Sequence, residues 1–274
     1  MPGSESMVSI IMPTWNSMRY IEEAIESLLL QTHRNFELLI CDGGSTDGTL
    51  NYLKSIDDSR IRIVSKQDNG LVNALNIGFS HAKGDVLCWL NSDDRYLAAD
   101  VLSRVCERLT ASDLQFVIGG CAMLAEDGTV MRYLLPWIPQ PPFKYRGHCN
   151  CFTGSLFFKK SVWTGFGQFS EKNKFAFEYE LVRHLMALPN QGAILKGPAI
   201  AGFRLRPDSV SGSNAHAMAL ERNAVVGHIV QENAPFKHQI VRLYSYFRLG
   251  LLLTFISYLR ANRNLSVDLN VQEN

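Results

Sequence analysis

Hydrophobic and polar positions follow two different periods along the first 120 residues. A short, mostly apolar run at 8–12 is typical of a strand that is buried on both faces, and the next strand is predicted at 36–41. At 20–31, apolar side chains recur every third or fourth position with glutamates between them, which predicts an amphipathic helix. Further strands are predicted at 61–65, 85–90 and 116–118, and further helices from 50, at 73–82 and at 99–109. The alternation predicts an α/β fold, a parallel sheet with helices on both faces.

The second half of the sequence has a less regular pattern. Residues 136–152 are rich in proline and aromatic side chains, which predicts an irregular loop. We expect a strand at 155–158, a loop at 203–214, and helices at 175–188, 215–233 and 236–261.

Composition and charge exclude several classes of protein. Lys and Arg number 27 and Asp and Glu 26, so the net charge of +1 provides no field to hold a nucleic-acid backbone. Hydrophobic residues make up 46% of the chain, which suits a packed globule, yet no apolar run approaches the roughly 20 residues of a membrane span. Six cysteines without a C-x-x-C pair, and an N-terminus without a signal-peptide pattern, predict a cytoplasmic protein with free thiols.

Polar side chains gather directly after the predicted strands. They are Thr14 and Asn16, then Asp42, Asp68, and Asp93 with Asp94. Ligands of such sheets bind at the carboxyl ends of the strands, so these residues predict a binding site. The adjacent carboxylates of Asp93 and Asp94 suit Mg²⁺ or Mn²⁺, and a polar turn that caps the next helix is the alternative.

A glycine-rich segment, DGGSTDGT at 42–49, follows the second strand. Its glycines allow the backbone to approach a ligand closely, but it matches neither the dinucleotide-binding nor the P-loop pattern. Asp42 then remains as an acceptor for a ligand N–H group, although a simple strand–turn–helix connection explains the glycines equally well.

Taken together, these motifs resemble those of the family 2 glycosyltransferases. The matching segments are PTWN at 13–16, DGGSTDGT at 42–49, DNG at 68–70 with Asn76 and Gly78, GD at 84–85, and LNSDD at 90–94. The resemblance covers residues 7–212 and is specific because several motifs occur in the right order. It implies a GT-A fold, with a Rossmann-like nucleotide-sugar-binding sheet and inverting sugar transfer. Its domain would span 7–233, with a nucleotide-binding half at 7–120, an acceptor-binding half at 121–233, and a C-terminal helix and tail at 234–274.

The resemblance also implies roles for individual residues. Nucleotide binding would fall to Pro13, Thr14, Trp15, Asn16, Asp42, Asp68, Asn91, Ser92 and Asp93. Residues 91–93 occupy the family's D-x-D position, so Asp93 would ligate a divalent metal, Mn²⁺ or Mg²⁺, with Asp94 as the fallback ligand. Asn91 departs from the usual first Asp, and because an amide carries no charge we expect weaker metal binding.

Two further motifs lie in the second half of the chain. Glu178 stands where the family carries its catalytic base, commonly Asp, and the alternative is that Glu178 and Glu180 are ordinary acids at a helix start. FRLRPDSVS at 203–211 resembles the family's F-R-x-H-x-x-S-x-S loop. Arg204, Arg206 and Ser209 would bind the diphosphate or the acceptor there, and a solvated surface loop is the alternative.

The implied reaction is sugar transfer from a nucleotide-diphosphate donor, with UDP favoured by its frequency in the family, to an acceptor hydroxyl. The setting would be bacterial surface polysaccharide or glycolipid assembly, where a lipid can carry the acceptor. A nucleotidyltransferase is one alternative, although a basic Gly-rich loop does not follow the first strand. A non-catalytic sugar-nucleotide-binding protein is another, suggested by Asn91 and Glu178.

The C-terminal segment 236–263 contains an apolar run at 249–259 with basic residues on both sides. As a helix that run spans only about 16 Å, too short to cross a bilayer. It is interpreted either as a helix packed against the domain or a second subunit, or as an interfacial helix on anionic lipid. Our hypothesis is weak peripheral binding at the inner face of the membrane, and a homodimer contact is the alternative.

Overall fold

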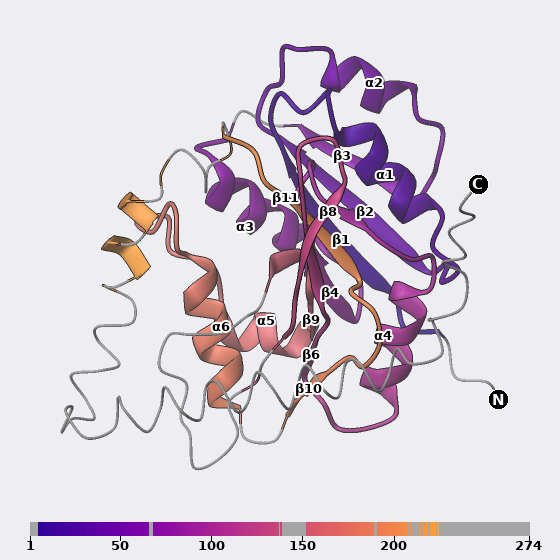
Figure 1. Cartoon of the computed structure of the whole chain (residues 1–274), viewed down its shortest axis with the longest axis vertical. Helices are drawn as coiled ribbons and strands as arrows, with labels where there is room; N and C mark the ends of the chain where they lie inside the picture. Colours follow the sequence, from indigo (N-terminus) through magenta and orange to yellow (C-terminus); the bar gives the residue numbers. More distant parts are fainter. Residues whose placement is uncertain are drawn as a thin grey trace, which may run out of the picture.

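The computed structural model describes residues 5–65, 68–136, 138, 152–188, 191–207, 209, 214, 216–218, 220–222 and 224. Its centre is a seven-stranded sheet of order β10-β6-β9-β4-β1-β2-β3 (Figure 1). The strands are β1 (Val8–Thr14), β2 (Phe36–Asp42), β3 (Ile61–Ser65), β4 (Val86–Trp89), β6 (Phe116–Ile118), β9 (Leu156–Lys159) and β10 (Gly192–Ile194). As predicted, β1 pairs in parallel with β2 and β4, and β2 with β3.

The sheet is mixed rather than fully parallel, which corrects the prediction. β9 lies antiparallel between β4 and β6. A contact at the strand ends accounts for this direction: the N–H of Gly119, just after β6, donates to the carbonyl of Ser155, just before β9, at 2.8 Å. The chain therefore enters β9 at the edge where β6 leaves the sheet, and the two strands must run in opposite directions.

A second, four-stranded sheet has the order β5-β11-β7-β8. Its strands are β5 (Arg95–Tyr96), β7 (Cys121–Leu124), β8 (Val130–Leu134) and β11 (Ala201–Arg204). The sequence did not predict this sheet, and the start of the expected 203–214 loop instead forms the end of β11. Because β11 pairs with β5, it brings the segment around Arg204 next to the Asp93–Asp94 turn.

Helices cover both faces of the large sheet, as predicted. They are α1 (Ile21–Leu29), α2 (Thr49–Ser55), α3 (Leu71–His81), α4 (Val101–Thr110), α5 (Lys160–Phe166) and α6 (Glu178–Ala187), with one 3₁₀ turn at Thr153–Ser155. Ile10 of β1 packs in the core with α1 and α4, and Ile11 packs in the other core with α3, α5 and α6. On that face α3 approaches β1 so closely that a Cβ on Gly78 would lie 2.4 Å from the Cγ2 atom of Ile11.

Other predictions are met in part or fall outside the described residues. α6 begins at Glu178 rather than at residue 175, α5 was not predicted, and helical turns occur within 216–224. Most of the 136–152 loop and all of the 236–263 segment lie outside the described residues. Within the part of the chain that is described, no helix is both long and apolar enough to span a membrane. The four described cysteines are buried thiols.

Candidate active site

The loops after β1 and β2 are tied together by Asn16. Its side-chain oxygen accepts a hydrogen bond of 2.8 Å from the N–H of Thr46, and its own N–H donates to the Ser45 hydroxyl at 2.8 Å. A third link joins the N–H of Gly43 to the carbonyl of Thr14 at 2.9 Å. Asn16 has a φ of 46°, a left-handed conformation that asparagine adopts more readily than most residues. The PTWN and glycine-rich motifs are therefore one structural unit.

The side chain of Asp42 lies inside this unit and stabilises the conformation of its glycine-rich loop. Its carboxylate is fully buried and accepts hydrogen bonds from the N–H groups of Gly44 and Ser45, both at 3.0 Å, and from the Ser45 hydroxyl. The sequence predicted that Asp42 accepts from a ligand N–H group. In the structure this carboxylate holds the glycine-rich loop.

Asp68 and Trp15 lie at the rim of the same unit. A Cβ on Gly43 would lie 3.0 Å from a carboxylate oxygen of Asp68, so this side chain rests on the glycine-rich backbone. Burial raises the pKa of Asp68, and the nearby charge of Asp42 adds to the increase. Trp15 is 70% exposed, so its ring is accessible for stacking, whereas Pro13 is buried within β1.

In the turn after β4, the two adjacent acids Asp93 and Asp94 lie in different environments. Asp94 is buried, and its oxygens accept hydrogen bonds from the N–H of Arg204 at 2.9 Å and from the Asn91 amide at 3.0 Å. Burial raises the pKa of Asp94 well above its usual range, and the charge of Asp93 adds to the increase. The turn is also fixed by a 2.6 Å hydrogen bond between the Ser92 and Ser17 hydroxyls. Asp94 is thus occupied by protein donors, which makes it a poor fallback ligand for a metal.

Asp93, unlike Asp94, has an accessible side chain. Its side chain is partly exposed, and its Oδ2 atom accepts a hydrogen bond of 2.8 Å from the Nε–H of Arg206. No cluster of three or more His, Cys, Asp and Glu residues suited to a metal occurs within the described ranges. A single accessible carboxylate fits Mg²⁺ or Mn²⁺ when substrate phosphates and water supply the other ligands. Asp93 is therefore the candidate ligand.

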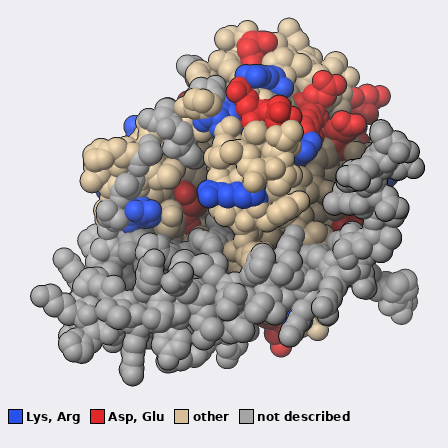
Figure 2. Space-filling model, in the orientation of Figure 1, with Lys and Arg blue, Asp and Glu red and all other residues tan. Residues whose placement is uncertain are grey.

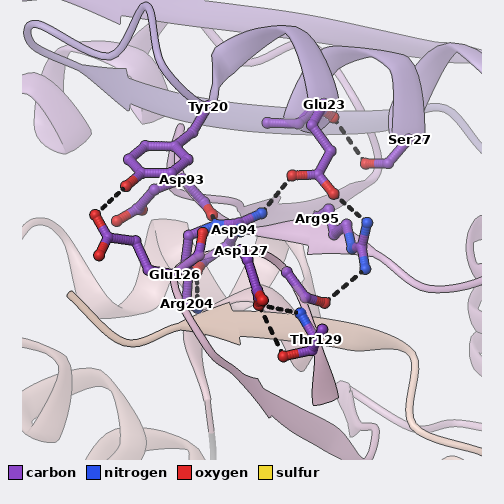
Figure 3. A network of polar contacts seen from close by, with 12 residues as sticks. Tyr20, Glu23, Ser27, Asp93, Asp94, Arg95, Glu126, Asp127, Thr129 and Arg204 are labelled. Atoms are coloured by element: carbon purple, nitrogen blue, oxygen red, sulfur yellow. Dashed lines mark hydrogen bonds and ion pairs between the residues drawn. The ribbon is translucent and has the colours of Figure 1, made fainter. Parts of the chain in front are cut away.

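The two arginines of the FRLR motif have different environments. Arg204 is 3% exposed, and it donates to the carbonyls of Asp93 and Glu126 at 3.0 and 2.8 Å and forms an ion pair with Glu23 (Figure 3). This differs from the expected phosphate-binding role, because its guanidinium is used inside the protein. Arg206 is more exposed and reaches the Asp93 carboxylate. The Ser209 hydroxyl donates to the Arg206 carbonyl at 2.8 Å.

Sequence reasoning missed three residues of this network, namely Tyr20, Glu23 and Glu126. The Tyr20 ring contacts the guanidinium groups of Arg204 and Arg206, at 4.9 and 5.1 Å from the ring centroid. The Tyr20 hydroxyl donates to Glu126 at 3.1 Å. Glu23 lies in the first turn of α1 beside Glu22, and Figure 2 shows acidic side chains gathered at the upper end of the molecule. The helical pattern gave no signal for these contacts, since their partners lie about 70 to 180 residues away.

Glu178 is the first residue of α6. Burial raises its pKa to about 7, and the negative charge of Glu221 adds to the increase. Glu221 was not predicted, and it accepts hydrogen bonds from the backbone just before α6. Glu180 holds the preceding loop, because its carboxylate accepts from the N–H of Ser170 at 3.3 Å and from the Asn173 amide. Glu178 and Glu180 therefore lie in different environments.

Comparison with known proteins identifies the family. The model of a family described as "Glycosyl transferase family 2" matches residues 9–166, more than half of the chain. The chain belongs to this family, as its motifs predicted.

Individual relatives and structures agree with this result. A glucosyltransferase of Escherichia coli, WfgD, is 31% identical over 131 residues, which are 47% of this chain and 51% of that protein. WfgD is described as acting on UDP-Glc and an α-D-GlcNAc-diphosphoundecaprenol, with a β-1,3 linkage. The matched regions span about half of WfgD and 22% of two Rickettsia relatives.

Two solved structures share the fold. S. aureus TarS 1-349 in complex with UDP-GlcNAc has a TM-score of 0.64 at 18% identity, over 96% of this chain and 76% of that one. The mannosyltransferase PcManGT of Pyrobaculum calidifontis, in complex with GDP-Man and Mn²⁺, has a TM-score of 0.63 at 19% identity, over 98% and 78%. These likenesses show the GT-A fold that the sequence predicted.

Proposed function

We propose that this protein transfers a sugar from a nucleotide-diphosphate donor to an acceptor hydroxyl, with inversion at the anomeric carbon. The observation that carries the proposal is the environment of Glu178. A partly buried carboxyl with a pKa of about 7 is ionised in a large fraction of molecules at neutral pH and still holds a proton well. That is the property required of a general base.

The proposed reaction transfers one proton and displaces one electron pair. The Glu178 carboxylate takes the proton of the acceptor hydroxyl while the hydroxyl oxygen bonds to the anomeric carbon. The bond from that carbon to the diphosphate oxygen breaks, and its electron pair leaves with the nucleoside diphosphate. Attack opposite the leaving group inverts the carbon. Arg206, a cation beside Asp93, stabilises the charge that develops on the diphosphate.

UDP is the favoured nucleotide. WfgD is described with UDP-Glc and TarS was solved with UDP-GlcNAc, whereas PcManGT was solved with GDP-Man. In this chain the exposed ring of Trp15 would stack on the base, with Asn16 and Asp68 in the loops beside it.

A divalent metal, Mn²⁺ or Mg²⁺, completes the donor site in this proposal, held by Asp93. When bound it neutralises diphosphate charge. The support is the accessible carboxylate of Asp93 and the Mn²⁺ of the PcManGT complex.

We further propose a lipid-linked saccharide as the acceptor, within bacterial surface polysaccharide or glycolipid assembly at the inner face of the cytoplasmic membrane. The support is the lipid diphosphate acceptor for which WfgD is described. The basic and apolar residues of 236–263 would then bring the enzyme to that membrane.

Glu178→Gln tests the reaction directly. Purified protein is incubated with UDP-Glc, UDP-GlcNAc or GDP-Man, Mn²⁺, and a GlcNAc-diphosphate lipid analogue or free GlcNAc, and NMR identifies the linkage formed. We expect transfer from one UDP sugar, with an inverted anomeric centre, and a kcat about 10²-fold lower in Glu178→Gln. Glu171→Gln, which alters an exposed acid of the same region, is the matched control. Unchanged turnover in Glu178→Gln would move the base elsewhere, and a retained anomeric configuration would exclude the mechanism.

A further inference from the structure

The Arg206–Asp93 ion pair lies at the position assigned to the metal. The Nε–H of Arg206 donates to Oδ2 of Asp93 at 2.8 Å, and the two side chains are 21% and 16% exposed. The neighbouring acid, Asp94, accepts hydrogen bonds from protein groups and is buried. Asn91 stands in place of the family's first Asp and brings no charge. The turn therefore offers one accessible negative charge, and a guanidinium is bound to it.

Both partners of this ion pair are held in place by other groups. The Arg206 guanidinium lies over the Tyr20 ring, 5.1 Å from its centroid, which favours a cation at this point. The backbone carbonyl of Asp93 accepts a hydrogen bond of 3.0 Å from the Nε–H of Arg204. Arg204 itself is fixed by Glu23 (Figure 3). Asp93 is thus anchored through its backbone, while its carboxylate faces an arginine that is less buried than Arg204.

We propose that Arg206 competes with the divalent cation for Asp93, and that the donor diphosphate relieves this competition by binding Arg206. The inference rests on the proposed function, because it requires a diphosphate donor. A carboxylate that accepts a charge-assisted hydrogen bond from a guanidinium is a weaker metal ligand, since the bond or its geometry must be given up. A diphosphate offers Arg206 a bidentate partner and also supplies oxygen ligands to the cation.

The consequence is a coupling between metal and donor. Cation alone binds weakly because it must displace a positive side chain from the only accessible acid of the turn. Donor alone and cation alone each bind less tightly than in the presence of the other, and linkage requires the two enhancements to be equal. In this scheme Arg206 determines which ligand Asp93 receives, in addition to binding the diphosphate.

The decisive measurement uses Mn²⁺ alone. The EPR signal of free Mn²⁺ is titrated with wild type, Arg206→Gln and Arg206→Lys, after circular dichroism has verified folding. We expect Arg206→Gln to bind Mn²⁺ about tenfold more tightly than wild type, as the loss of a partly buried ion pair implies, and Arg206→Lys to stay near wild type. Arg19→Gln is the matched control, because Arg19 also lies over the Tyr20 ring, at 5.2 Å, but pairs with Glu126 rather than Asp93.

Two further measurements show where the gain in Mn²⁺ affinity arises and distinguish it from the proposed function. Asp93→Asn in the Arg206→Gln background should abolish the gain, and with UDP present the enhancement of Mn²⁺ binding should be smaller in Arg206→Gln than in wild type. Equal Mn²⁺ affinities in wild type and Arg206→Gln, or an equal gain in Arg19→Gln, would overturn the competition. If no nucleoside diphosphate binds to any variant, the proposed function fails, and the coupling to the donor fails with it.

Discussion

The carboxylate of Glu221 accepts a hydrogen bond of 2.7 Å from the backbone N–H of Phe175, three residues before Glu178. It also accepts from the N–H groups of Lys174 and Ala176, at 3.2 and 3.1 Å. A residue beyond β11 therefore fixes the turn that begins α6, as the neighbouring position of these segments in Figure 1 illustrates. Through its charge Glu221 also adds to the pKa increase that burial produces in Glu178.

The pH profile of transfer follows from that pKa. Glu178 accepts a proton only as the carboxylate, so kcat/KM should rise with pH and level off above about 7. Measured from pH 5 to 9 with a saturating metal concentration, wild type should show this acidic limb and Glu178→Gln should not. A wild-type rate that is flat across the range would contradict the assignment of the base.

Glu221→Gln should move the acidic limb to lower pH. The substitution keeps an oxygen that accepts backbone hydrogen bonds but removes the charge that raises the pKa of Glu178. Glu221→Ala removes the hydrogen bonds as well, so we expect it to lower kcat in addition. Glu171→Gln serves as the control, because Glu171 contacts Asn73 instead. A limb that does not move in Glu221→Gln would limit Glu221 to a structural role.

Glu178 should also destabilise the folded protein at neutral pH. Its pKa is about 7 in the folded protein against an ordinary value of 4.5, so between these values the folded state holds a proton that the unfolded state has lost. Stability contributed by this group therefore falls as pH rises through that window. Glu178→Gln should be more stable than wild type at pH 8, by at most about 3 kcal/mol, and the difference should shrink toward pH 5. Urea denaturation at both pH values measures it, and an equal difference at the two would contradict the shifted pKa.

The sequence predicted the parallel centre of the fold because its signals are local. β1 and β2 are mostly apolar segments, and every residue in both is buried. The small sheet was missed because its strands are two to five residues long, and β11 pairs with β5 and β7 from a distant part of the chain. The same limit affected β9, whose direction depends on a contact between Gly119 and Ser155 that no periodicity encodes.

The sequence predicted which types of residue form the candidate site, but not which contacts they make. Motif spacing placed Asp93 and Asp94 at one strand end, yet residue type could not show that Asp94 is buried and Asp93 accessible. Likewise, two arginines in one loop looked equivalent. The ion pair that fixes Arg204 depends on Glu23, which lies 181 residues away in the chain.

Substitution of the two adjacent acids should give opposite results. Asp93→Asn should abolish Mn²⁺-dependent donor binding with little loss of stability, because its carboxylate faces a partly exposed partner. Asp94→Asn should retain donor binding but lose about 1–3 kcal/mol of stability, because one of its two buried acceptor oxygens becomes a donor. Calorimetric titration of UDP with Mn²⁺, and urea denaturation, measure the two effects. Loss of Mn²⁺-dependent binding in Asp94→Asn alone would make Asp94 the ligand.

Exchange of the residues at positions 91 and 94 tests the hydrogen bond between them. Asn91→Asp replaces the amide that donates to Asp94 at 3.0 Å with a second carboxylate, so we expect it to lose about 2 kcal/mol or more, increasingly at higher pH. Asp94→Asn alone also loses a partner.

In the double variant Asn91→Asp/Asp94→Asn the donor and acceptor are simply reversed. The amide introduced at position 94 can accept through its oxygen from the N–H of Arg204, while its NH₂ group donates to the carboxylate introduced at position 91. We therefore expect the double variant to be more stable than the sum of the two single variants by about 1–3 kcal/mol, measured by urea denaturation. Asn73→Asp combined with Asp94→Asn is the control pair, and it should be additive because Asn73 contacts Glu171 instead. Additivity in the 91/94 pair would mean that the Asn91–Asp94 hydrogen bond does not stabilise the turn.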